Sequence, residues 1–171
     1  GTLDVDYHAA VNDNIQVLYR ASDTVGTEGT TDAQRPQYAG TNDYSVGWFD
    51  GGEWLNYTRT LPAGLFNVYA RMSSPGVSTL NLSQVTSGQG TATQTTASLG
   101  NFVLENGQGW SVYSWVPLVD ASGSLVKLTL GGLATLRATS GGNANAQFFM
   151  LAPANTKLPA LIGIYPDGTT L

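Results

Sequence analysis

Residues 46–57 read Val-Gly-Trp-Phe-Asp-Gly-Gly-Glu-Trp-Leu-Asn-Tyr, and the fold can be inferred outward from this stretch. Trp48 and Trp54 flank a Gly-Gly turn, and an alternating apolar and polar pattern, typical of a half-buried β-strand, follows the second tryptophan. A large aromatic side chain before a strand either fills a core or offers a flat face to a partner. The surroundings of Trp48 therefore bear directly on function.

The same period-two alternation recurs along the chain. Further strands are expected at residues 65–72, 79–85, 97–104, 111–118, 125–130, 135–139 and 146–151. Helical periodicity is nearly absent, and residues 11–20 are its one weak candidate. Short strands separated by frequent glycine and proline turns predict an all-β protein, an antiparallel β-sandwich of the jelly-roll type.

Composition narrows the class of protein. Charged residues make up 11% of the 171, well below the roughly 25% of typical domains, while glycine is abundant at 21 residues. This balance is typical of an extracellular β-rich protein, with no cysteine and so no disulfide. A net charge of −5 argues against a nucleic-acid partner or an anionic membrane. No apolar run approaches the ~18 residues of a membrane span.

The chain is expected to divide near residue 155. Residues 1–155 form the predicted sandwich, with a long polar loop over residues 23–42. Residues 156–171 are a linker and either the first strand of a following domain or an added strand that covers this one. The chain opens on Gly-Thr without a signal peptide, so we expect a module excised from a larger secreted protein.

Catalytic signatures are weak. His8 is the only histidine, and the acidic residues Glu28, Asp50, Glu53 and Glu105 are scattered along the chain. Hydrolysis needs an activated nucleophile, a metal or a pair of carboxylates, and no motif points to one. We therefore expect a non-catalytic protein. A glycoside hydrolase or lyase on a similar sandwich stays as one alternative, and a structural or adhesion module as another.

A second aromatic cluster lies in residues 107–115, Gly-Gln-Gly-Trp-Ser-Val-Tyr-Ser-Trp. Trp110 and Trp115 are five positions apart and so fall on opposite faces of a strand. Trp115 precedes Val116 and Leu118 and is expected in the core. Trp110 follows a Gly-x-Gly turn at the entrance of the strand, which is a rim position like that of Trp48.

Four motifs in order resemble the family 6 carbohydrate-binding modules and their family 35 relatives. They cover about residues 44–151 and are the stretches 48–57 (aromatic, apolar, Asp, Gly-Gly, acid, aromatic), 62–71 (Pro-x-Gly and a strand), 107–113 (Gly-x-Trp) and 142–149 (Gly-x-Asn and a strand). Modules of this kind are attached to secreted bacterial polysaccharide-degrading enzymes. The resemblance implies a module that binds a plant, algal or microbial polysaccharide and targets a tethered glycoside hydrolase to it.

The resemblance also implies a site. In the family, two rim aromatics sandwich a sugar and an asparagine hydrogen-bonds it; the matching residues here are Trp48, Trp110 and Asn145. Tyr44 and Glu53 are further candidates for ligand contact. Trp54 and Tyr57 are expected to be mainly structural. Which glycan is bound is left open.

A structural calcium ion is a further implication of the resemblance, and here the chain departs from the pattern. The family supplies acidic ligands from a Glu-x-Glu strand near its start, whereas this chain has only Asp4 and Asp6 near its own. Gln147 stands two residues after Asn145, where an aspartate is common. Calcium favours oxygen ligands that include carboxylates, so two usual ligand sources are missing.

Overall fold

The computed structural model describes residues 14–16, 24–29, 44–89, 91 and 93–154, and the regular structure there is β-strand. The strands are β1 (Asn14–Gln16), β2 (Thr24–Gly29), β3 (Tyr44–Phe49), β4 (Trp54–Ser74), β5 (Ser78–Ser87), β6 (Thr95–Leu104), β7 (Gly109–Val119), β8 (Lys127–Ser140) and β9 (Ala144–Pro153). All of their pairings are antiparallel. The expected all-β antiparallel class is therefore confirmed. Within these ranges no helix has the length and apolar character needed to span a membrane.

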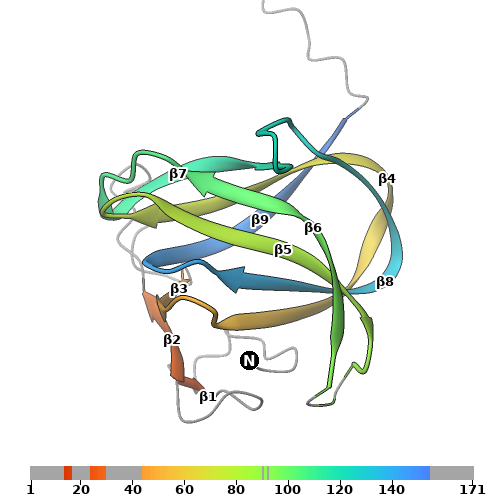
Figure 1. Ribbon diagram of the computed structural model, residues 1–171, viewed down its shortest axis with the longest axis horizontal. Coiled ribbons are helices and arrows are strands. Elements are labelled where there is room, and N and C mark those ends of the chain that lie inside the picture. The colour runs from red at the N-terminus through yellow and green to blue at the C-terminus, as the bar shows by residue number, and fades with distance from the viewer. Residues whose placement is uncertain (1–13, 17–23, 30–43, 90, 92, 155–171) are drawn as a thin grey trace, which may run out of the picture.

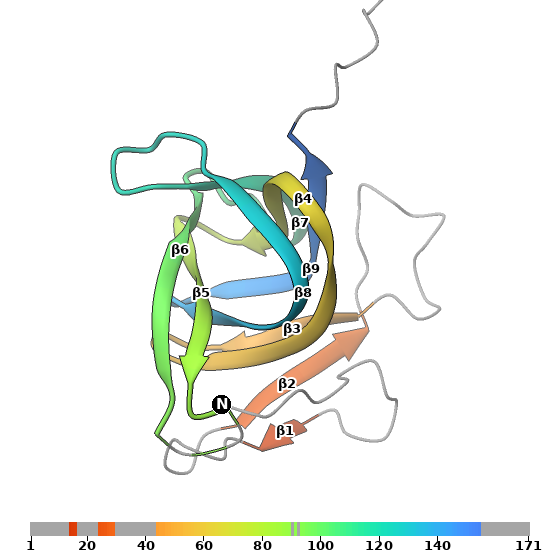
Figure 2. The ribbon, with the colours of Figure 1, turned by 90° about the vertical axis from the view of Figure 1, so that its right-hand side faces the viewer.

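The strands form one sheet that closes on itself. Their order is β1-β2-β3-β9-β4-β7-β6-β5-β8, and β8 also pairs with β4. Figure 2 shows the result, with β5 and β6 on one side and β4 and β8 on the other. Closure pairs the edge of β8 and so removes one of the open edges that make sheets prone to aggregation.

Strand β4 takes part in both halves of this closed sheet. Its first part pairs with β8, from Trp54 opposite Thr139 onward, and its last part pairs with β9, as far as Ser73 opposite Asn145. Figure 1 shows β4 sweeping up one side of the molecule and across its top. The sequence predicts two strands separated by a turn at residues 62–64. The structure instead has one bent strand with a shift of register there, because a β-bulge bends a strand without ending it.

Strand β8 bends at the same level. The expected separate strands 125–130 and 135–139 are one strand, Lys127–Ser140, with Gly131 and Gly132 at its middle. Gly132 lies opposite Leu61, beside the bulge of β4, and has a φ of 72° that glycine adopts without strain. The prediction of two strands was wrong because paired glycines inside a strand permit a bend as readily as a turn.

The region expected to be a long loop contains a strand. β2 (Thr24–Gly29) lies inside residues 23–42 and pairs with β3, which in turn pairs with β9. β3 itself was not predicted, so Trp48 lies near the end of a strand. β2 is mostly polar and contains two glycines, so it carries little alternation, which explains why the sequence pattern missed it. His8 and residues 156–171 lie outside the described residues, and the division near residue 155 stays a prediction.

The core follows the period-two pattern. It contains Val46, Phe49, Leu55, Phe66, Val68, Ala70, Met72, Leu80, Leu82, Phe102, Leu104, Val116, Leu118, Leu128, Ala138, Ala144 and Ala146. Tyr57 packs against this cluster with an edge-on contact to Phe149, ring centroids 5.8 Å apart, in line with its expected structural role.

Trp115 is a correction. It is 42% exposed, because Val116 and Leu118 take the inward positions of β7 and leave Trp115 on the outer face. There its ring lies edge-on to Phe148, with centroids 5.2 Å apart, and the Arg71 guanidinium lies 5.5 Å from its centroid.

Candidate functional site

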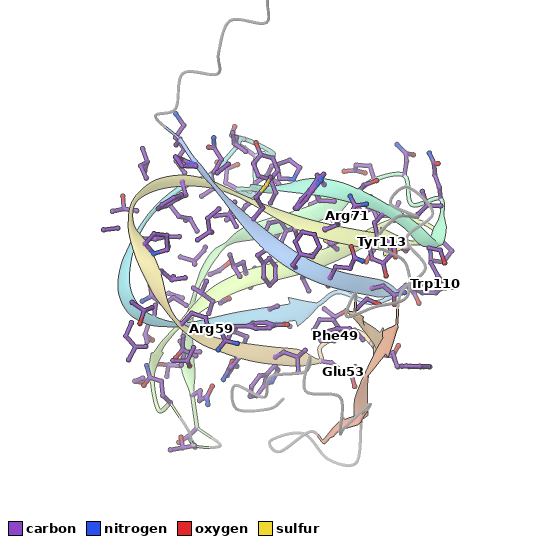
Figure 3. The ribbon with its side chains drawn as sticks, turned by 180° about the vertical axis from the view of Figure 1, so that it is seen from behind. Phe49, Glu53, Arg59, Arg71, Trp110 and Tyr113 are labelled. Carbon is purple, nitrogen blue, oxygen red and sulfur yellow. The ribbon has the colours of Figure 1, made fainter. Side chains whose placement is uncertain are left out.

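A pocket of about 380 Å³ opens where the ends of three strands meet. Its described lining consists of Trp48, Phe49, Asp50, Trp110, Asn143, Ala144 and Asn145. Register explains the meeting, because Phe49 of β3 lies opposite Ala144 of β9, and Ser73 and Ser74 of β4 lie opposite Asn145 and Gly109. Figure 3 shows Trp110, Phe49 and Glu53 on the same side of the molecule. The structure thus brings together Trp48, Trp110 and Asn145, which are far apart in the sequence and were predicted to contact the ligand.

Both tryptophans of the pocket are exposed. Trp48 is 65% and Trp110 47% accessible to solvent, which is unusual for side chains of this size. Neither contributes to the core cluster. Two large apolar faces at the rim of one pocket are typical of a binding site, since exposing them without a partner is unfavourable.

Backbone strain is concentrated at the same place. The only described non-glycine residues with positive φ are Trp48, at 49°, and Asn143, at 52°, and both line the pocket. For a bulky residue such as Trp48 this left-handed conformation is costly, whereas asparagine tolerates it. Strain of this kind persists where the surrounding structure holds it and often marks functional positions.

The backbone of Trp110 is held from two strands. Ser73 Oγ in β4 donates a hydrogen bond of 2.6 Å to the Trp110 carbonyl, and Asn145 Nδ2 in β9 donates a longer one of 3.4 Å. Ser73 is fully buried and Asn145 is 5% exposed. Asn145 is therefore a nearly buried polar residue of the pocket lining, and its amide is bonded to the backbone of Trp110.

The turn that presents Trp48 is also fixed. The Asp50 amide donates to Glu53 Oε2 at 2.7 Å, and the Glu53 amide donates back to the Asp50 carbonyl at 3.1 Å. Ser140 Oγ in β8 donates to the Phe49 carbonyl at 2.6 Å. The first two bonds fix the β3–β4 turn itself, and the third attaches the end of β3, which carries Trp48, to the end of β8.

The remaining sequence candidates are placed differently. Glu53 is 1% exposed and is not among the described residues that line the pocket, because its carboxylate is used to hold the turn below. Tyr44 begins β3, and its side chain lies outside the described part of the structure. Trp54 lies on the β4–β8 face with the Arg137 guanidinium 3.5 Å from its ring centroid, which agrees with a structural role.

Sequence reasoning missed two polar lining residues, Asp50 and Asn143. Asp50 precedes the Gly-Gly turn and was considered only as a scattered carboxylate. Asn143 follows Gly141-Gly142, a context that favours a residue able to adopt the left-handed conformation. That preference was the available signal, although it indicates a turn as much as a site.

Metal-ligating and catalytic groupings can be assessed for the described residues. Over these ranges no three His, Cys, Asp or Glu side chains come together in a way that could hold a metal ion. Asp50 is the only carboxylate in the described pocket lining, so that lining contains no facing carboxylate pair. Asp4 and Asp6 lie outside the described residues, and the structural calcium ion stays a prediction of the resemblance.

Comparison with protein-family models finds no match, and comparison with curated proteins also finds none. Solved structures give clear matches, and several of them are family 6 carbohydrate-binding modules. A Clostridium stercorarium module in complex with cellobiose has a TM-score of 0.56 and 15% identity, covering 82% of this chain and 93% of its own. A module of Cellvibrio mixtus lichenase 5A in complex with cellotriose has a TM-score of 0.56 and 19% identity, covering 84% and 93%.

The third example is a β-1,3-glucan-binding family 6 module of Bacillus halodurans. Its TM-score is 0.54 and its identity 23%, and the match covers 82% of this chain and 96% of the module. Identities at this level establish a shared fold. The resemblance to family 6 modules expected from the four sequence motifs is therefore confirmed at the level of the fold.

Proposed function

We propose that this chain is a non-catalytic carbohydrate-binding module whose ligand lies between Trp48 and Trp110, above Asn145. The observation that carries this proposal is the convergence of two exposed tryptophans and a buried asparagine on one pocket. The apolar C–H faces of a sugar ring stack on indole rings, and its hydroxyls need amide partners. The fold is that of modules described as bound to cellobiose or cellotriose or as binding β-1,3-glucan, which supports a β-glucan or a related polysaccharide as ligand.

The module would act by keeping a tethered glycoside hydrolase close to its polysaccharide, which raises the local concentration of enzyme on the substrate. The origin of one structural neighbour in a lichenase supports such a parent enzyme. We also propose that the protein is secreted. We propose further that its closed sheet has the jelly-roll connectivity. Affinity for one sugar segment is expected to be modest, because stacking is partly offset by desolvation of hydroxyls.

A polysaccharide panel tests the proposal. Affinity electrophoresis through gels containing β-1,4-glucan, β-1,3-glucan, xylan, mannan or agarose would be run with the wild type, Trp110→Ala and Trp115→Ala. Trp115 is the matched control because it is comparably exposed yet does not line the pocket.

We expect at least one glycan to retard the wild type and Trp115→Ala but not Trp110→Ala. Equal retardation of all three proteins would show that the site is elsewhere. Failure of the wild type to bind any glycan would favour a structural or adhesion module instead.

A further inference from the structure

The described lining of the pocket contains one charged side chain, that of Asp50. Asp50 is exposed and is the only charged residue in the described lining. Its backbone is fixed by the two hydrogen bonds with Glu53, while no described residue donates a hydrogen bond to its carboxylate. Asp50 is therefore fixed at the pocket by its backbone, and its carboxylate is not used to hold the described part of the fold.

The described cations lie elsewhere. Arg71 is buried beneath Tyr113 and Trp115, 5.8 and 5.5 Å from their ring centroids. Arg137 lies over Trp54, and its Nε donates to Asn56 Oδ1 at 3.0 Å. Arg59 donates to its neighbour's carbonyl, and Lys127 begins β8. Since none of these lines the pocket, no described cation offsets Asp50, and the chain as a whole carries a charge of −5.

We infer that Asp50 makes this site selective for the charge of the sugar. This inference rests on the proposed function. A sugar stacked between Trp48 and Trp110 comes close to the Asp50 carboxylate. An amino sugar can then place its ammonium group as a hydrogen-bond donor to that carboxylate, whereas a uronate meets a like charge.

Among sugars with the same glycan backbone, the amino sugar should therefore bind most tightly, the neutral sugar less tightly and the acidic sugar least tightly. Two unit charges about 6 Å apart in water change affinity by about threefold for each step, and more where the pocket excludes water.

Three β-1,4-linked disaccharides of matched size test this order by calorimetry: cellobiose, its diglucosamine counterpart and its uronate-containing counterpart. They would be titrated into the wild type, Asp50→Asn and Asp120→Asn, at low salt and in 1 M NaCl. Asp120 is the matched control because it follows the end of β7 opposite to Trp110. Hydrogen bonds from Ser122 and Ser124 hold its pKa below the usual value, so it is charged at neutral pH.

We expect the order to hold in the wild type and in Asp120→Asn, and to collapse toward equal affinities in Asp50→Asn. High salt should narrow the spread in the wild type, a readout that does not depend on any variant.

Binding of cellobiose with no charge preference overturns this inference and leaves the proposed function standing. Equal preferences in Asp50→Asn and the wild type also overturn it. Absence of binding by all three sugars overturns this inference, whereas only failure of the wild type to bind every polysaccharide of the panel contradicts the proposed function.

Discussion

Ser73 Oγ donates a hydrogen bond of 2.6 Å to the backbone carbonyl of Trp110, so a fully buried residue of β4 fixes a rim residue of β7. Asn145 lies opposite Ser73 in the β4–β9 register and donates to the same carbonyl at 3.4 Å. The rim and the floor of the pocket thus meet at one acceptor. Because the Ser73 bond is the shorter, we expect it to contribute more to the position of Trp110 than the Asn145 bond does.

Ser73→Ala tests this arrangement. Loss of the short bond from a buried site should lower the free energy of unfolding by about 1–3 kcal/mol and also weaken glycan binding, because Trp110 loses its fixed position. Chemical denaturation and calorimetric titration measure the two effects. Ser83→Ala is the control, since Ser83 Oγ donates a bond of 2.6 Å to Asn81 away from the pocket. It should lose stability alone, and equal loss of binding in both variants would contradict the role of Ser73.

The positive φ of Trp48 predicts an unusual order of stability among its variants. Glycine adopts this conformation without strain, whereas alanine keeps most of the strain. The free energy of unfolding of Trp48→Gly should therefore be about 0.5–1 kcal/mol higher than that of Trp48→Ala. Both variants should lose glycan binding.

Trp110 supplies the comparison for that order. It has no positive φ and lies in a strand, where glycine is unfavourable. Trp110→Gly should accordingly be less stable than Trp110→Ala. Thermal or urea unfolding of the four variants is the measurement, and the same order at both positions would argue against strain at Trp48.

Glu53 is expected to support the site indirectly. Glu53→Ala leaves the Asp50 amide without its acceptor and should cost about 1–3 kcal/mol of unfolding free energy. Glu53→Gln retains an oxygen acceptor and should lose less. Denaturation of the two variants decides this, and an alanine variant as stable as the glutamine variant would show that the hydrogen bond to Asp50 does not hold the turn.

Gly107 precedes β7 and is predicted to tolerate no side chain. A Cβ there would lie 2.3 Å from the Ser74 carbonyl oxygen and 2.4 Å from that of Gly76, so backbone must move. We expect Gly107→Ala to destabilise the protein by about 1–3 kcal/mol, as overpacking does. Gly76→Ala, whose Cβ meets nothing within 4 Å, should be nearly neutral. Equal melting temperatures for the two variants would contradict the close approach.

Much of the fold could be predicted where one face of a strand is buried. The stretches 65–72, 79–85, 97–104 and 111–118 all alternate and lie within strands of the structure. What alternation cannot show is whether a strand continues through a bend. The stretch at residues 62–64 and the pair Gly131-Gly132 look like ends of strands, yet both permit bends where β4 and β8 cross between halves of the sheet.

The site was predictable in part for a related reason. The position of Trp48 and Trp110 beside glycine turns indicated a rim, and the family pattern added Asn145. The spacing of Trp110 and Trp115 predicted that they lie on opposite faces of a strand. Which face points into the core depends on the inward packing of Val116 and Leu118, which the spacing does not show. The burial of Glu53 likewise depends on contacts with a distant strand, β8, which no local pattern contains.

A glycan held between Trp48 and Trp110 should be visible in a two-dimensional NMR titration. The titration follows the four indole N–H signals, from Trp48, Trp54, Trp110 and Trp115, as cellotriose or the best ligand of the panel is added. We expect the Trp48 and Trp110 signals to shift with one common dissociation constant, while those of Trp54 and Trp115 stay in place. Saturable binding that shifts Trp54 or Trp115 and leaves Trp48 and Trp110 unchanged would contradict this expectation.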